Sequence, residues 1–228
     1  WTNWHYDQTI NQQGTQLDLA LINGALELSD QAALKLGDDI RRVSGIDNPN
    51  SVAQLKQWLS EKLGKDIDKL GKEAVNELLE APQVKANPAV YYVLKKRKEM
   101  AKSSVKKYTA MGNAVCKDGR VRGLLQFYGA NRTGRWAGRL VQVQNLPRNY
   151  IPELSLARNL VKQENAAMLE LTYGSLPDTI SQLIRTAFVP REGYEFVVAD
   201  FSAIEARVIS WLAGEDWRLE VFRTHGKI

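Results

Sequence analysis

The sequence predicts a predominantly helical α+β fold. Apolar residues recur at three- and four-residue steps through most of the first 112 positions, which is the spacing of one helix face. The pattern changes after Met111, where glycines, turn signals and short β-type runs alternate. We therefore expect a boundary near residues 112–118, with helices before it and mixed α and β structure after it.

The helices expected before this boundary lie between recognisable start and stop signals. Asp18 and Ser51 are N-cap residues for the first two, and Gly45 and Gly64 stop these helices. The expected ranges are 18–45, 51–64, 68–82 and 88–112, the last running from Pro88 to Gly112, with a turn around Gly14 before the first.

The second half of the chain is expected to mix turns, strands and helices. In chain order, the expected elements are a turn at Asp118-Gly119, a strand within 121–129, an arginine-rich turn, an extended segment over 139–147, a helical stretch over 151–184 that includes one helix over 151–174, a buried strand through Phe196-Val197-Val198 and a helix over 202–214.

Basic residues are concentrated in the middle of the chain. The formal net charge of the 228 residues is +5, but residues 88–148 alone hold fourteen lysines and arginines against two acidic residues. The remainder is therefore net negative. A basic block of this kind predicts a polyanionic partner, most often nucleic acid, and the alternative is a solvated basic face.

The composition argues against several classes of protein. No apolar run approaches the roughly 20 residues of a membrane span. The polar, aromatic opening WTNWHYDQ does not resemble a signal peptide, and without an initial Met we expect the natural start to lie elsewhere. Cys116 is the single cysteine, so an intrachain disulfide is excluded, and a structural role in a reducing compartment is favoured.

Two acidic residues near the end of the chain have competing interpretations. Ser202 and Glu205 have the S-x-x-E spacing of a capping box, in which Glu205 bonds to the backbone N–H of Ser202. Asp200 is not needed for such a cap, and it follows the expected strand. A carboxylate there is a natural ligand of Mg²⁺. Together with the basic block, it favours metal-assisted phosphoryl or nucleotidyl transfer.

Three segments resemble those of the family A DNA polymerases. VVADFSAIEARVISWLAGE (197–215) resembles the first palm motif, D-Y/F-S-x-I-E-x-R, and ANRTGRWAGRLVQVQNLPR (130–148) resembles the upstream T-G-R and Q-N-x-P segment. The stretch 183–202 is similar to the connection between them, and 124–148 is of the bacteriophage and prophage type. The earlier helices match the thumb region more weakly, although 95–108 resembles its DNA-gripping helix.

The resemblance implies a metal and nucleotide site around the first palm motif. Asp200 and the backbone carbonyl of Phe201 match ligands of two catalytic Mg²⁺ ions. Ser202 and Ala203 lie where the phosphates of the incoming deoxynucleoside triphosphate pass, and Ala203 replaces a frequent Gln, so a side-chain contact is lost. Glu205 matches the residue that crowds the sugar 2′ position, a role compatible with the capping box.

The resemblance also implies contacts with a DNA primer–template. Arg135 matches the arginine of T-G-R that touches the minor groove at the primer end, where the acceptors of all base pairs are nearly alike; the alternative is a solvated turn arginine. The other implied DNA contacts are Thr133, Arg132, Gln144 and Asn145 around this arginine, and Lys102, Ser103, Ser104 and Lys106 on the basic helix.

The expected organisation is a helical thumb-like region over 1–112 and the first part of a palm domain over 113–228, with a small antiparallel sheet and a helical insertion at 149–182. The second carboxylate motif, H-D-E, and the finger helix R-x3-K-x6/7-Y-G do not occur in the sequence. We therefore expect a monomeric fragment of a DNA-directed DNA polymerase from the cytoplasm of a bacterial host cell, without membrane contact and inactive alone. Two alternatives are a non-catalytic duplex-binding module and a structural fragment.

Overall fold

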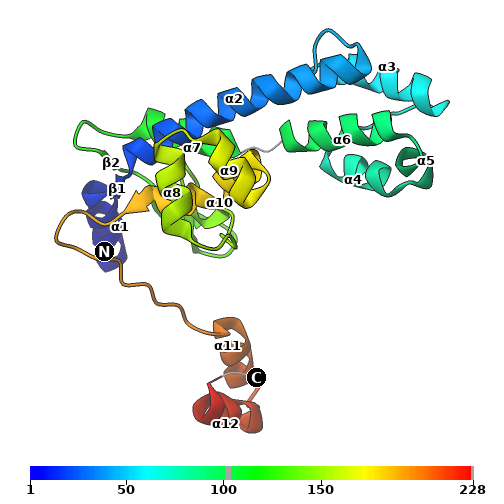
Figure 1. Cartoon of the computed structure of the whole chain (residues 1–228). Coiled ribbons are helices and arrows are strands. Elements are labelled where there is room, and N and C mark those ends of the chain that lie inside the picture. Colours follow the sequence, from blue (N-terminus) through cyan, green and yellow to red (C-terminus); the bar gives the residue numbers. More distant parts are fainter. Residues whose placement is uncertain (101–103, 227–228) are drawn as a thin grey trace. The chain divides into compact units, whose positions relative to one another are not determined.

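The computed structural model describes residues 1–100 and 104–226. It divides into two compact units, Trp1–Val189 and Pro190–Ile228. Helices predominate, and the strands form small antiparallel sheets, so the predicted α+β class is confirmed (Figure 1). Within the two described ranges, no helix combines the length and the apolar character that a membrane crossing requires.

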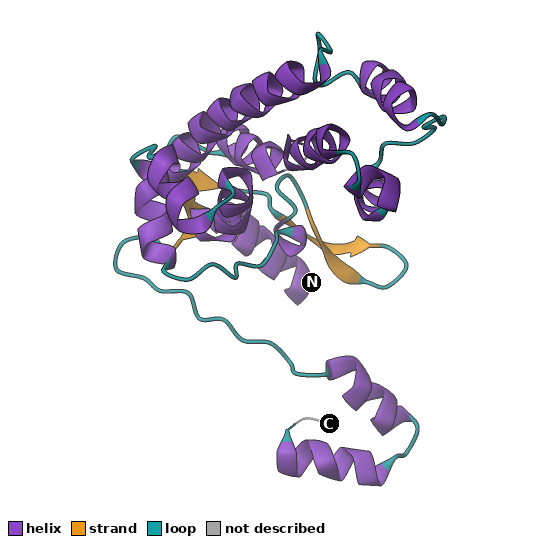
Figure 2. Ribbon diagram, turned by 45° about the vertical axis from the view of Figure 1, so that its right-hand side comes forward, coloured by secondary structure: helices purple, strands orange, loops and turns teal. Residues whose placement is uncertain are grey.

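The first unit is built mainly from helices (Figure 2). Its α-helices are α1 (Thr2–Gln13), α2 (Leu19–Ser44), α3 (Val52–Leu63), α4 (Lys72–Glu80), α5 (Pro82–Lys85), α6 (Pro88–Met100), α7 (Ser104–Ala114), α8 (Leu154–Lys162), α9 (Ala166–Tyr173) and α10 (Leu176–Leu183). Two short 3₁₀ helices, η1 (Val143–Asn145) and η2 (Ile184–Ala187), complete the helical structure of this unit.

The long helix α2 takes part in two separate hydrophobic cores (Figure 1). Its N-terminal half, including Leu21 and Leu28, packs with side chains from α7, α8, α9 and α10. Ile40, near its C-terminal end, packs with side chains from α3, α4 and α6. Because 26 residues of helix extend about 39 Å, α2 links the two cores as a single rigid element.

Two small sheets complete the first unit. One has the order β2-β1-β5, formed by β2 (Arg120–Val121), β1 (Thr15–Leu17) and β5 (Phe188–Val189), with antiparallel pairing throughout. The other is the antiparallel hairpin of β3 (Leu125–Ala130) and β4 (Arg135–Gly138). Because β1 pairs with β2 and β5, the start of the chain shares a sheet with segments beyond residue 112, and the packing shows no boundary at that residue. The assignment of thumb and palm stays a prediction.

Asp18 joins the start of α2 to α8. Its Oδ1 accepts a hydrogen bond from the N–H of Leu21 at 3.1 Å, as an N-cap does. Its Oδ2 lies 2.5 Å from the guanidinium of Arg158 and 2.6 Å from Nζ of Lys162, both on α8. Burial acts to raise the pKa of Asp18, but the hydrogen bonds from Lys162 and Leu21 and the two positive charges outweigh it, and the pKa lies below its ordinary value.

A glycine allows α2 and α8 to approach closely. Gly24 is buried in α2, and a Cβ atom there would fall inside contact distance of the carbonyl oxygen of Val161. Gly37, also buried in α2, has room, because the nearest atom to a Cβ would be Cγ of Pro49 at 3.8 Å. The two glycines therefore differ in what a side chain would meet.

Most of the local signals in the sequence are confirmed. Asp18 caps α2, and Ser51 caps α3 by accepting from the N–H of Gln54 at 3.3 Å. Gly45 and Gly64 follow these helices with left-handed backbone, at φ angles of 72° and 65°. Gly119 has a φ of 75° in the predicted turn, and the predicted strand after it is β3.

Three expectations for the first unit are wrong. The helix expected over 88–112 does not end at Gly112, because α7 continues to Ala114. Whether α6 and α7 form one helix, as predicted, depends on residues 101–103, which lie outside the described residues. The segment 151–174 is two helices, because Asn165 caps α9 by accepting from the N–H of Met168. The segment 139–147 is not extended but turns into η1, with bonds from the N–H groups of Gln142 and Asn145 to the carbonyls three residues before.

The expected buried strand is also absent from the second unit. Phe196, Val197 and Val198 form no strand and are 52%, 88% and 90% exposed. A strand requires a hydrogen-bonding neighbour, and these residues pair with no other strand in the part of the chain that the structure describes. The unit instead consists of this segment and the helices α11 (Ile204–Leu212) and α12 (Asp216–His225).

We predict opposite effects for two glycine-to-alanine substitutions in α2. Gly24→Ala lowers the free energy of unfolding, because overpacking against α8 costs roughly 1–3 kcal/mol and exceeds the gain in helix propensity. Gly37→Ala raises it by roughly 0.5–1 kcal/mol, since the methyl group fits and the helix gains propensity. Urea unfolding measures both, and a stabilising Gly24→Ala contradicts the close packing of α2 on α8.

We predict that Asp18 contributes to acid sensitivity. Because folding lowers its pKa, its stabilisation is present above the ordinary value of 3.8 and is lost as the pH falls through the lower folded value. Asp18→Asn keeps an oxygen for the Leu21 N–H but removes the charge. The unfolding free energy of this variant, followed from neutral pH into the acid range, should fall less steeply than that of the unaltered chain; equal slopes contradict the prediction.

Candidate nucleic-acid interface

The hairpin β3–β4 presents the arginine-rich turn to solvent. The N–H groups of Thr133 and Gly134 donate to the carbonyl of Ala130 at 3.0 and 2.9 Å, which closes the turn. Gly134 has a φ of 67°, and a Cβ there would meet the ring of Tyr128 at 2.8 Å, so a glycine is required. The turn leaves Arg132, Thr133 and Arg135 exposed on one hairpin.

The loop that follows β4 returns to lie against it. A Cβ atom on Gly138 would overlap the side-chain amide of Gln144, so Gln144 lies directly on the strand. The N–H of Arg139 donates to the carbonyl of Leu124 at 2.7 Å and fixes the start of the loop. Gln144 and Asn145, both exposed on η1, are thereby brought next to the hairpin that carries Arg135.

Arg185 holds the other end of this loop. Its guanidinium donates to the carbonyls of Leu146 at 2.6 Å and Pro147 at 2.9 Å. Sequence reasoning did not assign this residue, although it lies inside the 183–202 segment that resembles the family. An arginine in the segment before the acidic motif is visible in the sequence. Its partners, the carbonyls of Leu146 and Pro147, cannot be read from the sequence.

The helix α7 is joined to the same loop. Lys107 donates from Nζ to the carbonyl of Val141 at 2.6 Å, while Lys106 is exposed. The opposite face of α7 is fixed by Tyr108, which is fully buried and donates its hydroxyl to the carbonyl of Ile180 at 2.9 Å. Burial raises the pKa of Tyr108 well above its usual range, so the hydroxyl stays neutral.

The hairpin, η1 and α7 are linked through the 139–147 loop by Gln144 and Lys107, and we call these three elements together the hairpin–helix surface. It includes the predicted residues Arg132, Thr133, Arg135, Gln144, Asn145 and Lys106. Of the remaining predicted residues, Ser104 begins α7 without a described side chain, and Lys102 and Ser103 lie outside the described residues. Exposed lysines and arginines on a continuous surface can neutralise phosphates without reading a base sequence.

The acidic motif belongs to the second unit. Asp200, Phe201, Ser202, Ala203 and Glu205 are all exposed. The capping-box expectation is wrong, because the N-cap of α11 is Ala203 and it makes no side-chain capping bond. With the helix starting one residue later than predicted, Glu205 takes the second helical position rather than the third that a capping box requires.

Arg207 holds the second unit together. It donates to the carbonyl of Ser202 at 2.8 Å and to the carbonyl of Gly226 at 2.6 Å, and its guanidinium lies 4.4 Å from the ring of Phe222. These contacts join the start of α11 to the end of α12. Arg207 therefore has a structural role in this unit.

The described carboxylates do not by themselves make a two-magnesium site. No group of three or more histidine, cysteine, aspartate or glutamate side chains within residues 1–100 and 104–226 is arranged to hold a metal ion. Asp200 is a single exposed carboxylate, and Mg²⁺ held by one carboxylate keeps most of its water ligands. We therefore derive no metal-dependent step from these residues.

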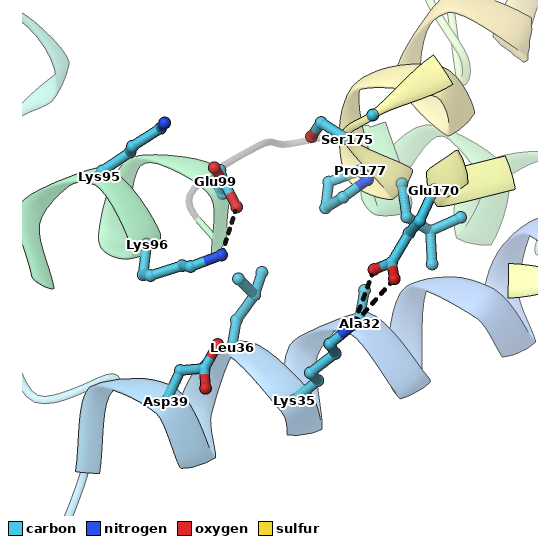
Figure 3. A pocket seen from close by; sticks show the side chains of 12 residues that line it. Ala32, Lys35, Leu36, Asp39, Lys95, Lys96, Glu99, Glu170, Ser175 and Pro177 are labelled. Atoms are coloured by element: carbon cyan, nitrogen blue, oxygen red, sulfur yellow. Dashed lines mark hydrogen bonds and ion pairs between the residues drawn. The ribbon is translucent and has the colours of Figure 1, made fainter. Parts of the chain in front are cut away.

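A pocket of about 330 Å³ lies between α2, α6 and the start of α10 (Figure 3). Lys35 pairs there with Glu170 at 2.8 Å, and Lys96 pairs with Glu99 at 3.5 Å. Lys95 and Asp39 complete a lining in which positive and negative side chains balance. None of the predicted site residues lines this pocket, and its balanced charge does not favour a triphosphate.

The fold and the hairpin–helix surface define an α+β protein whose exposed basic side chains suit a polyanion. Comparison with known proteins is more specific. A family model described as "DNA polymerase family A" matches residues 24–228. The chain belongs to this family, and the resemblance found in the sequence is confirmed.

Two relatives illustrate the range of similarity. A DNA polymerase of Bacillus phage SP02 is 57% identical over 225 residues, which cover 99% of this chain and 34% of that protein. The thermostable DNA polymerase I of Thermus thermophilus is 27% identical over 218 residues, which cover 92% of this chain and 22% of that protein. The chain thus spans about a third of the length of the first relative and about a fifth of the second.

Proposed function

We propose that the chain is part of a DNA-directed DNA polymerase and that it grips the primer–template duplex. The observation that carries the proposal is the hairpin–helix surface, in which Lys107 and Gln144 connect the basic helix, the loop and the hairpin. The family match over 24–228 supports the choice of DNA over other polyanions. The phage relative supports action in the cytoplasm of a bacterial host.

In this proposal, residues 1–112 act as the thumb and 113–228 as the first part of the palm. Arg135 contacts the minor groove at the primer end, with Thr133, Gln144 and Asn145 beside it. Lys106 and its neighbours on the basic helix follow the phosphate backbone. Helices α8 to α10, expected as an insertion at 149–182, support this surface from behind, since the Tyr108 hydroxyl on α7 bonds to Ile180.

The catalytic part of the proposal concerns the second unit. Asp200 and the Phe201 carbonyl would be ligands for the two Mg²⁺ ions of the complete polymerase, and Ser202, Ala203 and Glu205 would lie along the incoming deoxynucleoside triphosphate. Exposed apolar residues on α11 and before it, including Phe201, Ile209, Trp211 and Leu212, support the view that further polymerase structure covers this unit.

A non-catalytic duplex-binding module is the second candidate. It is favoured by the lack of a metal-binding group among the described residues. The two candidates share the hairpin–helix surface and differ in whether Asp200 acts in synthesis.

We predict salt-dependent binding of a primer–template duplex with weak sequence preference. If about five phosphates are contacted, log K should fall with log salt at a slope near −4 to −5. Lys106→Glu should weaken binding to all sequences alike. Arg42→Glu, which reverses the same charge on α2 outside residues 88–148, serves as the matched control and should bind nearly as the unaltered chain does. Fluorescence anisotropy at several salt concentrations measures this, and a flat salt dependence rejects the proposal.

We predict that the chain as given does not extend a primer. Positioning and charge stabilisation supply most of the catalysis in phosphoryl-type transfer, and one exposed carboxylate provides neither. Primer extension with Mg²⁺ or Mn²⁺ should give no product, with Asp200→Ala as the control for a contaminating polymerase. Product that disappears in Asp200→Ala would show that these residues complete an active site without further chain.

A further inference from the structure

The N-terminal helix α1 is attached to the molecule without burying any residue. Its large side chains face solvent, with Trp4 48% and Tyr6 58% exposed. Hydrophobic burial therefore contributes little to its position. The contacts that hold it are polar, and they converge on the outer edge of the β3–β4 hairpin (Figure 2).

Two side chains of α1 bond to the backbone of β3. Asn11 donates from Nδ2 to the carbonyl of Leu125 at 2.8 Å and accepts at Oδ1 from the N–H of Leu125 at 3.1 Å. Its amide thus pairs with one strand residue as a neighbouring antiparallel strand would. Asp7 accepts from the N–H of Phe127 at 2.8 Å, and its Oδ1 also accepts from Nδ2 of Asn11 at 3.3 Å.

The spacing of these residues matches the spacing of the strand groups. Residues four apart on a helix are separated by about 6 Å along the axis, and residues two apart on a strand by about 6.8 Å. Asp7 and Asn11 can therefore meet Phe127 and Leu125 together. This contact satisfies backbone groups on an edge that would otherwise be open to solvent or to another strand.

The C-terminal end of α1 is held by two arginines that precede the hairpin. Arg122 donates to the carbonyl of Gln12 and Arg120 to the carbonyl of Gln13, both at 2.8 Å. These carbonyls are among the last of the helix, where positive charge is favourable. Arg122 is itself held by Asp118 through bonds of 2.9 and 2.6 Å.

A two-stranded hairpin alone is marginally stable in water and needs support from another element. We propose that Asp7 and Asn11 are positioning residues that make α1 the third element of this hairpin and so hold the Thr133–Arg135 turn in the orientation that contacts duplex DNA. The inference rests on the proposed function, because it assumes that the hairpin binds DNA. Neither residue touches DNA itself.

The test uses the full chain with Asp7→Ala, Asn11→Ala and two controls. Asn3→Ala changes an exposed residue of the same helix that makes no hydrogen bond to β3 among the described residues, and Asp7→Asn keeps an oxygen that can accept from the Phe127 N–H. Primer–template affinity is measured by fluorescence anisotropy, and hydrogen exchange is followed over residues 125–138. Both alanine variants should bind about five-fold more weakly, since a hydrogen bond is worth roughly that factor.

The hairpin amides of these variants should exchange faster, while the thermal midpoint of the helical core stays unchanged. Asn3→Ala should resemble the unaltered chain, and Asp7→Asn should recover most of the affinity. Unchanged affinity in the alanine variants of a chain that binds DNA overturns this inference alone. Equal weakening by Asn3→Ala, or no recovery with Asp7→Asn, overturns it as well. An unaltered chain that shows no salt-dependent binding overturns the proposed function together with the inference.

Discussion

The arrangement of the first unit depends on the contacts of Asp18. Its carboxylate caps α2 and pairs with Arg158 and Lys162 of α8, while its own N–H donates to the carbonyl of Ala187 at 2.8 Å. One residue therefore joins the start of α2, the helix α8 and the end of η2. Because α2 continues from this point into both hydrophobic cores, the position of its first turn determines where each core is built.

Polar contacts to backbone carbonyls organise the surface proposed to bind DNA. Lys107 bonds to Val141, Arg185 to Leu146 and Pro147, and Asn11 to Leu125. A surface that must meet a charged duplex cannot bury large apolar side chains on its outer face. Hydrogen bonds to backbone carbonyls can replace apolar burial there, and those from the charged Lys107 and Arg185 are shorter and stronger than bonds between neutral groups. They hold loops in place while the neighbouring basic residues stay exposed.

The second unit shows how an apolar pattern can lead to an exposed segment. Val197 and Val198 have the composition of a buried strand, yet they are exposed because no strand pairs with them among the described residues. The apolar sequence pattern indicates that the segment is suited to a buried strand, whereas its burial also requires a strand to pair with. In the same unit, the contacts of Arg207 with Ser202, Phe222 and Gly226 keep α11 and α12 together with little buried apolar surface.

The sequence by itself determined the features that arise within a few residues. The caps by Asp18 and Ser51, the left-handed glycines after α2 and α3, and the turn at Gly119 all follow from local hydrogen bonds and backbone preferences. The family also followed from the sequence, because its motifs are short and ordered along the chain. The same local reasoning failed for Glu205, since a one-residue shift in the start of α11 removed the capping box.

Only the tertiary structure decided which distant segments meet. The strand β1 is three residues long and pairs with β2 and β5, which lie more than a hundred residues away, so no local pattern distinguishes it from a loop. The partners of Arg185 and Asn11 are likewise backbone groups far along the chain, and every residue carries such groups. Which backbone groups become the partners of these side chains depends on the packing of α2 against α7 and α8, which brings the segments within hydrogen-bonding distance. The close approach at Gly24 is set in the same way, because it is the carbonyl of Val161 that excludes a side chain there.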